Sequence, residues 1–299
     1  MSSSITAPFY LATTFTSSPF GGNPAAVIFM DTSLPLEKMG GYAKNFNQPM
    51  LSVVSPTSLP SDSEKTLVRS IRFIAPNGKL VPICGHGLIA ASKAVFSLPE
   101  VVANGADTIH FKNAHGQTLG AFKHEDGSFE IQLPVTVPGT VSDENKARIK
   151  AAVDKAFGRN VIVENIVNGG DVYKPYVLVH LHESEDLAGS SVDAKELAAT
   201  GFIVNIFTTV SPTSGQLFVS RMFSPSMVPE PHEDHVCGSA HGVLVPYWSS
   251  RLAISPGEEF KAKMVSQRSG DLRLTYQKAE GILKLRGNVV IFASGTFPL

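Results

Sequence analysis

Residues 232–248 read HEDHVCGSAHGVLVPYW and contain one of the two cysteines of this 299-residue chain. Acidic residues and histidines precede Cys237, whereas Gly238 and a long apolar run follow it. The run is apolar nearly all round, which is typical of a helix that is buried on every side. We therefore expect a buried helix over 240–252, with a Cys-Gly loop immediately before it.

The second cysteine occurs in a similar arrangement. Residues 81–96 read VPICGHGLIAASKAVF, so that Cys84 and Gly85 again precede an apolar run, here over 87–96. An apolar helix of this kind fits the interior of a sheet that curls around it. Two such helices predict two separate cores.

A short pattern also recurs upstream of each cysteine. It is RFIAP at 72–76 and RMFSP at 221–225, an arginine followed by apolar residues and a proline. The two cysteines themselves are 153 positions apart (237 − 84), about half the chain. The repeated order of strand, proline, Cys-Gly and apolar helix predicts two similar domains, each presenting one Cys-Gly loop at the start of a helix.

Short runs rich in β-branched and aromatic residues, separated by turn residues, predict strands along most of the chain. Surface helices are expected at 36–46, 143–157 and 193–200, with Asp143 capping the second. We predict an α/β (α+β) fold with two pseudo-symmetric domains, each a curled, mostly antiparallel sheet around a central helix. A charged turn within FKHEDGSF favours a boundary between 125 and 126, which gives a first domain over 1–125 and a second over 126–285.

The composition narrows the class of protein. Apolar residues make up 43% of the chain and charged residues 17%, which allows a substantial core. The net charge of −1 and the lack of a long basic run argue against nucleic-acid binding. We expect no membrane span and no signal peptide. Two cysteines do not form a disulfide framework, so we predict a cytoplasmic protein with reduced thiols.

The Cys-Gly loops suggest acid–base chemistry. A helix N-terminus exposes unpaired N–H groups and a partial positive charge, which favour a bound carboxylate or a thiolate. Gly85 and Gly238 would let a ligand approach the backbone closely. If both loops faced one substrate carbon, one thiolate could remove a proton while the opposite thiol returned one, inverting the carbon without a cofactor. The loop N–H groups would stabilise the enolate-like charge.

Other interpretations of the same residues stay open. Each cysteine could be a small buried apolar side chain, or the two could form a disulfide. Asp234 and Ser239 could be helix caps, and His86 could be a histidine hydrogen-bonded at a helix start. Metal-ligand types also gather around Cys237, although loop histidines beside an anion site more often line it, so we predict no metal. These metal-ligand types are His232, Glu233, Asp234, His235 and His241.

Four segments together resemble the PhzF family of phenazine-biosynthesis-like isomerases. They are FGGNPAAVIF at 20–29, IRFIAPNGKLVPICGHGLIAASKAVF at 71–96, SRMFSP at 220–225 and EDHVCGSAHGVLVPYW at 233–248. The resemblance implies the diaminopimelate-epimerase-like fold, in which a C-terminal strand, here 286–299, returns to the first domain. It also implies a cleft between the domains, no cofactor and a homodimer.

The resemblance carries over to individual residues. His86, Asp234 and Ser239 match the family's active-site histidine, motif aspartate and motif serine. Asn23 lies in a Gly-Asn-Pro turn that looks toward the cleft in the family, and Gly170 in a glycine turn near the substrate. We therefore expect a set of catalytic residues and a set of substrate-binding residues. The catalytic set is Cys84, Cys237, His86 and Asp234, and the substrate-binding set is Asn23, Gly85, Gly87, Gly170, Gly238, Ser239 and Ala240.

One position departs from the family pattern. The acid–base glutamate of the family falls on Met50, which cannot carry a proton. Related epimerases and racemases of the same fold use two cysteines in similar loops, and this chain has a cysteine in both.

Three hypotheses follow for the function. The first is a cofactor-independent epimerase or racemase that inverts a carbon next to the carboxylate of a small metabolite, with Cys84 and Cys237 as bases. The second is a PhzF-like proton-shift isomerase that uses Asp234 and His86. The third is a non-catalytic descendant that binds a metabolite or a protein, which the loss of the glutamate favours. The paired cysteines favour the first.

Overall fold

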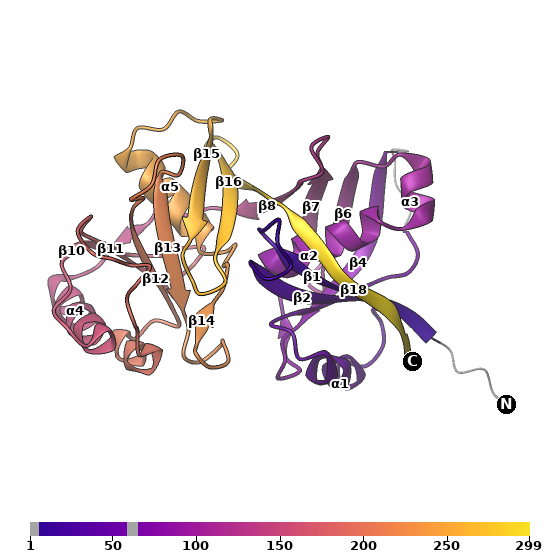
Figure 1. The fold of residues 1–299 in the computed structure, drawn as a ribbon, viewed down its shortest axis with the longest axis horizontal. Helices are drawn as coiled ribbons and strands as arrows, with labels where there is room; N and C mark the ends of the chain where they lie inside the picture. Colours follow the sequence, from indigo (N-terminus) through magenta and orange to yellow (C-terminus); the bar gives the residue numbers. More distant parts are fainter. Residues whose placement is uncertain (1–5, 59–64) are drawn as a thin grey trace. The chain divides into compact units, whose positions relative to one another are not determined.

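A computed structural model describes residues 6–58 and 65–299 of the chain. It is a mixed α/β fold that divides into two compact units (Figure 1). Unit 1 comprises Met1–Gln132 and Arg286–Leu299, and unit 2 comprises Leu133–Leu285. The division thus follows residue 132 rather than residue 125, because the charged turn that we took as a boundary is a hairpin turn within unit 1, closed by the bond from the His124 N–H to the Ser128 carbonyl (3.0 Å).

Unit 1 contains one curled sheet with the strand order β18–β1–β2–β3–β4–β6–β7–β8. Neighbouring strands are antiparallel, except that β2 and β3, and β4 and β6, are parallel. The two-residue strand β5 pairs with the end of β4. The elements of unit 1 are β1 (Thr6–Thr14), β2 (Asn23–Phe29), α1 (Leu36–Phe46), β3 (Leu51–Val54), β4 (Thr66–Ile74), β5 (Leu80–Val81), α2 (Gly85–Phe96), α3 (Pro99–Asn104), β6 (Thr108–Lys112), β7 (Thr118–Lys123), β8 (Phe129–Pro134) and β18 (Val289–Pro298).

Unit 2 repeats this topology with the order β9–β10–β11–β12–β13–β15–β16. Its parallel pairs are β11–β12 and β13–β15, and the two-residue strand β14 pairs with the end of β13. The expected fold of two related domains is therefore confirmed. The elements of unit 2 are β9 (Gly139–Thr140), α4 (Asp143–Phe157), β10 (Val163–Asn168), β11 (Tyr176–Leu181), the 3₁₀ helix η1 (Ala194–Thr200), β12 (Val204–Val210), β13 (Phe218–Phe223), β14 (Glu233–Asp234), α5 (His241–Arg251), β15 (Glu259–Met264), β16 (Gly270–Gln277) and β17 (Ile282–Gly287).

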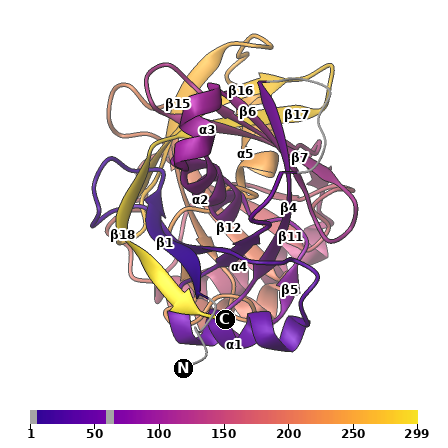
Figure 2. The same ribbon diagram turned by 90° about the vertical axis from the view of Figure 1, so that its right-hand side faces the viewer.

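The two apolar segments form the central helices of the two units. Every residue of α2 except Lys93 is buried, and the helix contacts β1, β2, β3, β7 and β18, so the sheet wraps around it (Figure 2). In α5, Trp248 stacks on Phe218 of β13 with ring centroids 5.5 Å apart and donates a hydrogen bond to Thr208 of β12 (3.0 Å). The helices begin at Gly85 and His241, two residues before and one residue after the positions expected.

The surface helices lie where the sequence pattern places them. α1 and α4 match the expected ranges, whereas η1 is a 3₁₀ helix. The expected cap of α4 was wrong by one residue. Ser142, with extended dihedral angles, accepts the Asn145 N–H (3.4 Å), and Asp143 is already helical. None of the helices within 6–58 and 65–299 combines the length and apolar character needed to span a membrane.

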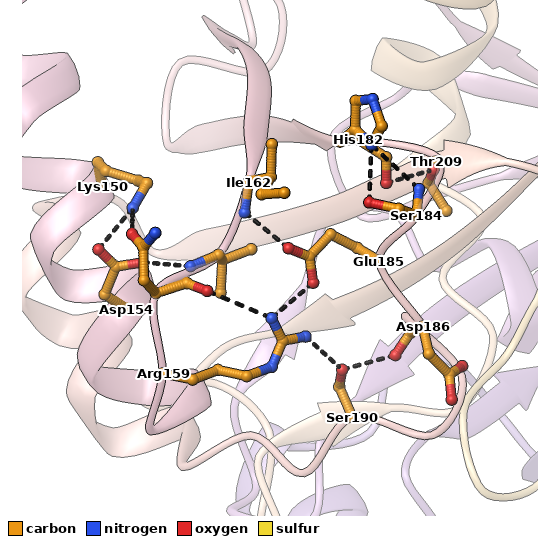
Figure 3. Close-up of polar contacts among 12 residues, drawn as sticks. Lys150, Asp154, Arg159, Ile162, His182, Ser184, Glu185, Asp186, Ser190 and Thr209 are labelled. Carbon is orange, nitrogen blue, oxygen red and sulfur yellow. Dashed lines mark hydrogen bonds and ion pairs between the residues drawn. The ribbon is translucent and has the colours of Figure 1, made fainter.

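The connection from β11 to η1 is anchored by ion pairs and hydrogen bonds (Figure 3). The carboxylate of Glu185 accepts the Ile162 N–H (2.7 Å) and pairs with Arg159 (2.6 Å). Arg159 also donates to the Ser190 hydroxyl (3.3 Å), which in turn donates to the Asp186 carbonyl (2.6 Å). The connection therefore has fixed contacts to the segment that follows α4.

The repeated arginine holds the same connection in each unit. Arg221 of β13 donates to the carbonyls of Leu187 (3.2 Å) and Ser190 (2.6 Å) in the β11–η1 connection. Arg72 of β4 donates to the Thr32 carbonyl (3.2 Å) in the β2–α1 connection. Both connections join two parallel neighbouring strands, so the sequence repeat marks a repeated structural role.

Candidate functional site

The two cysteines occupy equivalent positions in the two units. Cys84 lies three residues after Val81, the last residue of β5, and Cys237 lies three residues after Asp234, the last residue of β14. Both thiols are reduced and buried. Because β5 and β14 pair with equivalent strands, each cysteine stands between a two-residue strand and the central helix of its unit.

Cys84 is the residue that caps α2. It has extended dihedral angles (φ −137°, ψ 112°), and its Sγ accepts the Gly87 N–H at 3.4 Å. His86 places Nδ1 at 3.3 Å from the same sulfur. The structure thus brings Cys84, Gly85, His86 and Gly87 into one turn, where the helix N-terminus favours negative charge on the sulfur.

The start of α2 packs tightly against β3. A Cβ atom on Gly87 would lie 2.8 Å from Ser52 Oγ and 3.1 Å from Met50 Cγ. The Ser52 hydroxyl donates to the Gly87 carbonyl (2.9 Å). Met50 is 7% exposed and comes immediately before β3, so an apolar side chain packs here, at the position that the resemblance assigns to a glutamate.

Cys237 is fixed mainly through its backbone. Its N–H donates to Met264 Sδ (2.9 Å), and its carbonyl accepts a hydrogen bond from His241 Nδ1 (2.8 Å). Its Sγ lies 3.3 Å from Ser239 Oγ. Residues 238–240 form a separate turn before α5, closed by the bond from the His241 N–H to the Gly238 carbonyl (3.1 Å). Gly238, Ser239 and Ala240 therefore precede the helix.

Two tyrosines that the sequence analysis did not name lie beside this turn. The hydroxyl of Tyr176, the first residue of β11, is 2.9 Å from Ser239 Oγ. Tyr173 donates to the Pro134 carbonyl (2.8 Å), and its ring lies 2.5 Å from where a Cβ on Gly242 would be. Burial raises the pKa of both tyrosines, and the charge of Cys237 raises it further, so both hydroxyls stay protonated at neutral pH.

Several of the histidines and acids around Cys237 have partners of their own. Burial lowers the pKa of His241 to about 4, so this imidazole is neutral at neutral pH. Asp234 Oδ1 accepts the Val236 N–H (3.2 Å), and Glu233 pairs with Arg221 (2.6 Å). Across residues 6–58 and 65–299, no group of three or more His, Cys, Asp or Glu side chains is arranged to hold a metal ion.

The remaining expected site residues lie at strand ends. Asn23 begins β2 and is buried, and its carbonyl accepts a hydrogen bond from the Thr14 hydroxyl (3.1 Å). Gly170 has a φ of 57°, which favours glycine, and its N–H donates to Asn168 Oδ1 (2.9 Å). Gly170 thus begins the segment that carries Tyr173 and Tyr176. The pair of glycines at 169–170 was the one sequence signal near these tyrosines.

The repeated curled sheets, each with a Cys-Gly loop before its central helix, define a class of two-domain α/β proteins. The family model described as "Phenazine biosynthesis-like protein" (PhzC-PhzF) matches residues 12–295, and the chain belongs to this family. The resemblance seen in the sequence is confirmed.

Curated relatives agree with this assignment over nearly the whole chain. The chain is 30% identical over 303 residues to phenazine biosynthesis-like domain-containing protein 1 of Mus musculus, covering 97% of this chain and 98% of that protein. It is 28% identical over 292 residues to a Pseudomonas aeruginosa protein named an uncharacterized isomerase, with 97% and 98% covered.

Solved structures share the fold. A PhzF family protein of Enterococcus faecalis superposes with a TM-score of 0.78 at 25% identity, covering 99% of this chain and 100% of that chain. A hydroxyproline epimerase of Agrobacterium vitis, solved with bound trans-4-hydroxy-L-proline, has a TM-score of 0.55 at 11% identity, with 98% and 93% covered. The second likeness concerns the fold alone.

Proposed function

We propose that this chain is a cofactor-independent epimerase or racemase that inverts a carbon next to a carboxylate, with Cys84 and Cys237 as its acid–base groups. Membership of the family, together with a relative named as an isomerase, supports an isomerase-type function. The observation that carries the finer proposal is the equivalent placement of the two thiols. Each follows a two-residue strand by three residues, and each has a polar side chain two residues later at 3.3 Å from its sulfur.

The proposed reaction consists of two proton transfers. One cysteine thiolate takes the proton from the carbon next to the carboxylate, and the electron pair of the broken C–H bond moves onto the carboxylate. The other thiol then gives its proton to the opposite face of the same carbon, and the sulfur that gives it becomes the thiolate. Each turnover exchanges the protonation states of the two sulfurs, and the two thiols supply both transfers without a cofactor.

The neighbours of each sulfur fit these roles. The Gly87 N–H and His86 Nδ1 lie within hydrogen-bonding distance of Cys84 Sγ, so both can stabilise its thiolate form. Gly85 and Gly238 carry no side chain, so the proposal assigns the carboxylate of a small metabolite to the backbone N–H groups of these two loops. Met50 provides no proton at the family's glutamate position, so the proposal assigns both transfers to sulfur.

The test uses both enantiomers of a panel of amino acids and 2-hydroxy acids in D₂O. The α-proton is followed by NMR and the configuration by chiral chromatography. We expect the wild-type protein to invert one pair and to incorporate deuterium at its α-carbon. Cys84→Ser and Cys237→Ser should each lower the rate of inversion by about 10²- to 10⁴-fold, because either change removes one acid–base group. Each single variant should still exchange the α-proton of one enantiomer only, the one whose proton faces the remaining thiol.

Asp234→Asn separates the thiol mechanism from the proton-shift alternative. If turnover survived both cysteine changes but was lost in Asp234→Asn, the acid–base groups would not be the cysteines. Inversion without deuterium uptake would also contradict the proposal. Thermal unfolding of each variant checks that a lost rate is not lost structure.

A further inference from the structure

Tyr176 lies at the end of a short chain of polar groups that leads to Cys237. Its hydroxyl is 2.9 Å from Ser239 Oγ, and Ser239 Oγ is 3.3 Å from Cys237 Sγ. In unit 1 the corresponding contact to sulfur comes from the imidazole of His86, which can itself carry a positive charge. Ser239 has only a neutral hydroxyl, so the donor to the Cys237 sulfur depends on where that hydroxyl hydrogen points.

Several other groups of unit 2 near Cys237 have contacts of their own. His241 is neutral at neutral pH and its Nδ1 is bonded to the Cys237 carbonyl, and burial also lowers the pKa of His235. Asp234 accepts a hydrogen bond from the Val236 N–H (3.2 Å). Tyr173 directs its hydroxyl hydrogen to the Pro134 carbonyl. The Ser239 hydroxyl lies 3.3 Å from the sulfur, within hydrogen-bonding distance.

One direction of this chain of hydroxyls places a hydrogen on the sulfur. Tyr176 stays protonated at neutral pH, because burial is the main factor that raises its pKa. When its hydroxyl donates to Ser239 Oγ, the hydrogen of Ser239 is left to point at the sulfur. Hydrogen bonds aligned in this way strengthen one another.

We propose that Tyr176 is a positioning residue for Cys237, which acts through Ser239 to direct a hydroxyl hydrogen at the sulfur and so favours the thiolate. This inference rests on the proposed role of Cys237 as an acid–base group. The hydrogen-bond chain acts on the sulfur whether or not a substrate is present, which makes the inference measurable without turnover.

The test uses the Cys84→Ser protein, in which Cys237 is the remaining one of the two cysteines. The rate of alkylation by iodoacetamide is followed by intact mass over a range of pH, since only the thiolate reacts. Adding Tyr176→Phe should lower the rate about 5- to 10-fold near neutral pH, the effect of losing one hydrogen bond. The rate at high pH, where the thiolate is fully formed, should not fall. A purely structural role would not shift the pH profile in this way.

Tyr276→Phe is the matched control, because Tyr276 is another tyrosine of unit 2 whose pKa burial raises, and it lies in β16. Its alkylation profile should equal that of the Cys84→Ser parent. Ser239→Ala should slow alkylation at least as much as Tyr176→Phe, and the two changes together should equal Ser239→Ala alone, because Tyr176 acts through Ser239.

Two results would overturn the inference. One is an alkylation profile of Tyr176→Phe that coincides with that of Tyr276→Phe. The other is full additivity of the Tyr176→Phe and Ser239→Ala effects. If the profile shifts as expected but inversion survives Cys237→Ser, the positioning role holds and the proposed function fails. If inversion needs both cysteines but Tyr176→Phe leaves alkylation unchanged, the proposed function holds and the positioning role fails.

Discussion

In unit 1 the central helix begins at the residue after Cys84, whereas in unit 2 a turn over residues 238–240 separates Cys237 from its helix. The sulfur of Cys84 caps α2 directly, while Cys237 is held by its backbone N–H and carbonyl. The spacing from short strand to cysteine is nevertheless the same in both. The repeat has therefore kept the position of the thiol along the chain, while the groups that contact it have diverged.

The repeated arginines show the same kind of divergence. Arg221 has a carboxylate partner, Glu233, in two bonds of 2.6 and 2.9 Å, in addition to its carbonyl contacts. In the strand register Glu233 is opposite Phe223, and the equivalent pair in unit 1 is Leu80 opposite Ile74. An apolar residue thus stands in unit 1 where unit 2 has the buried carboxylate. These differences should affect how much each unit contributes to stability and how that contribution depends on pH.

The largest expected difference in stability concerns these arginines. Arg221→Met leaves the buried Glu233 carboxylate unpaired and should lower the free energy of unfolding by about 3–5 kcal/mol. Arg72→Met loses one hydrogen bond and should cost about 1 kcal/mol. Urea unfolding measures both. Arg221→Met combined with Glu233→Leu removes the buried carboxylate together with its partner and should recover part of the loss. Equal losses for the two single arginine changes would contradict the comparison.

A second difference is in the response to pH. His241 lies four residues after Cys237, and the residue four after Cys84 is Leu88, which does not titrate. The pKa of His241 is about 4 in the folded protein and about 6.5 in the unfolded chain, so the unfolded chain binds the extra proton between these values. The stabilisation is complete above about pH 6.5 and is lost as the pH falls toward 4, a change of about 3 kcal/mol.

His241→Asn tests this directly, because asparagine keeps a donor for the Cys237 carbonyl but has no proton to gain. Urea unfolding at a series of pH values between 4 and 7 should show a smaller loss of stability for the variant. His180, whose pKa burial also lowers to about 4, titrates in both proteins and cancels in the difference. Parallel curves for the wild type and the variant would rule out His241 as the source.

The smallest expected effect concerns glycines in helices. Alanine in place of a helical glycine ordinarily stabilises by about 0.5–1 kcal/mol, and Gly41→Ala in α1, where a Cβ meets nothing within 4 Å, should do so. Gly87→Ala should instead destabilise by about 1–3 kcal/mol, because its Cβ would meet Ser52, Met50 and Phe73 at 2.8–3.2 Å. Gly242→Ala, against the Tyr173 ring, should destabilise as well. A stabilising Gly87→Ala would show that α2 is not tightly packed at its start.

The sequence was most informative where a pattern is local. The central helices were predictable because a segment that is apolar all round must be buried, and α4 followed from the periodic spacing of its apolar residues. The sequence pattern placed the domain boundary at the hairpin turn over 124–128, because charged turns occur both within and between domains. The equivalence of Arg72 and Arg221 was also visible locally, because each begins a copy of the repeated pattern of arginine, apolar residues and proline.

The contacts of the thiols could not be predicted in the same way. Tyr176 and Ser239 are 63 residues apart in the chain, and the tertiary fold brings them together. Nothing in the segment NGGDVYKPY distinguishes an inward-facing tyrosine from one in a loop. Met264, which accepts the Cys237 N–H, is likewise 27 residues away. Such side-chain partners depend on tertiary register, which a single sequence does not specify.

The pairing of β18 with β1 has a consequence for synthesis on the ribosome. Unit 2 is contiguous over 133–285, whereas unit 1 needs a strand that emerges after all of unit 2. During translation, one edge of β1 therefore stays unpaired until β18 has been synthesised. An unpaired strand edge can form hydrogen bonds with other chains. We expect unit 2 to gain protease resistance on stalled nascent chains before unit 1 does, which pulse proteolysis of chains released at successive lengths would reveal.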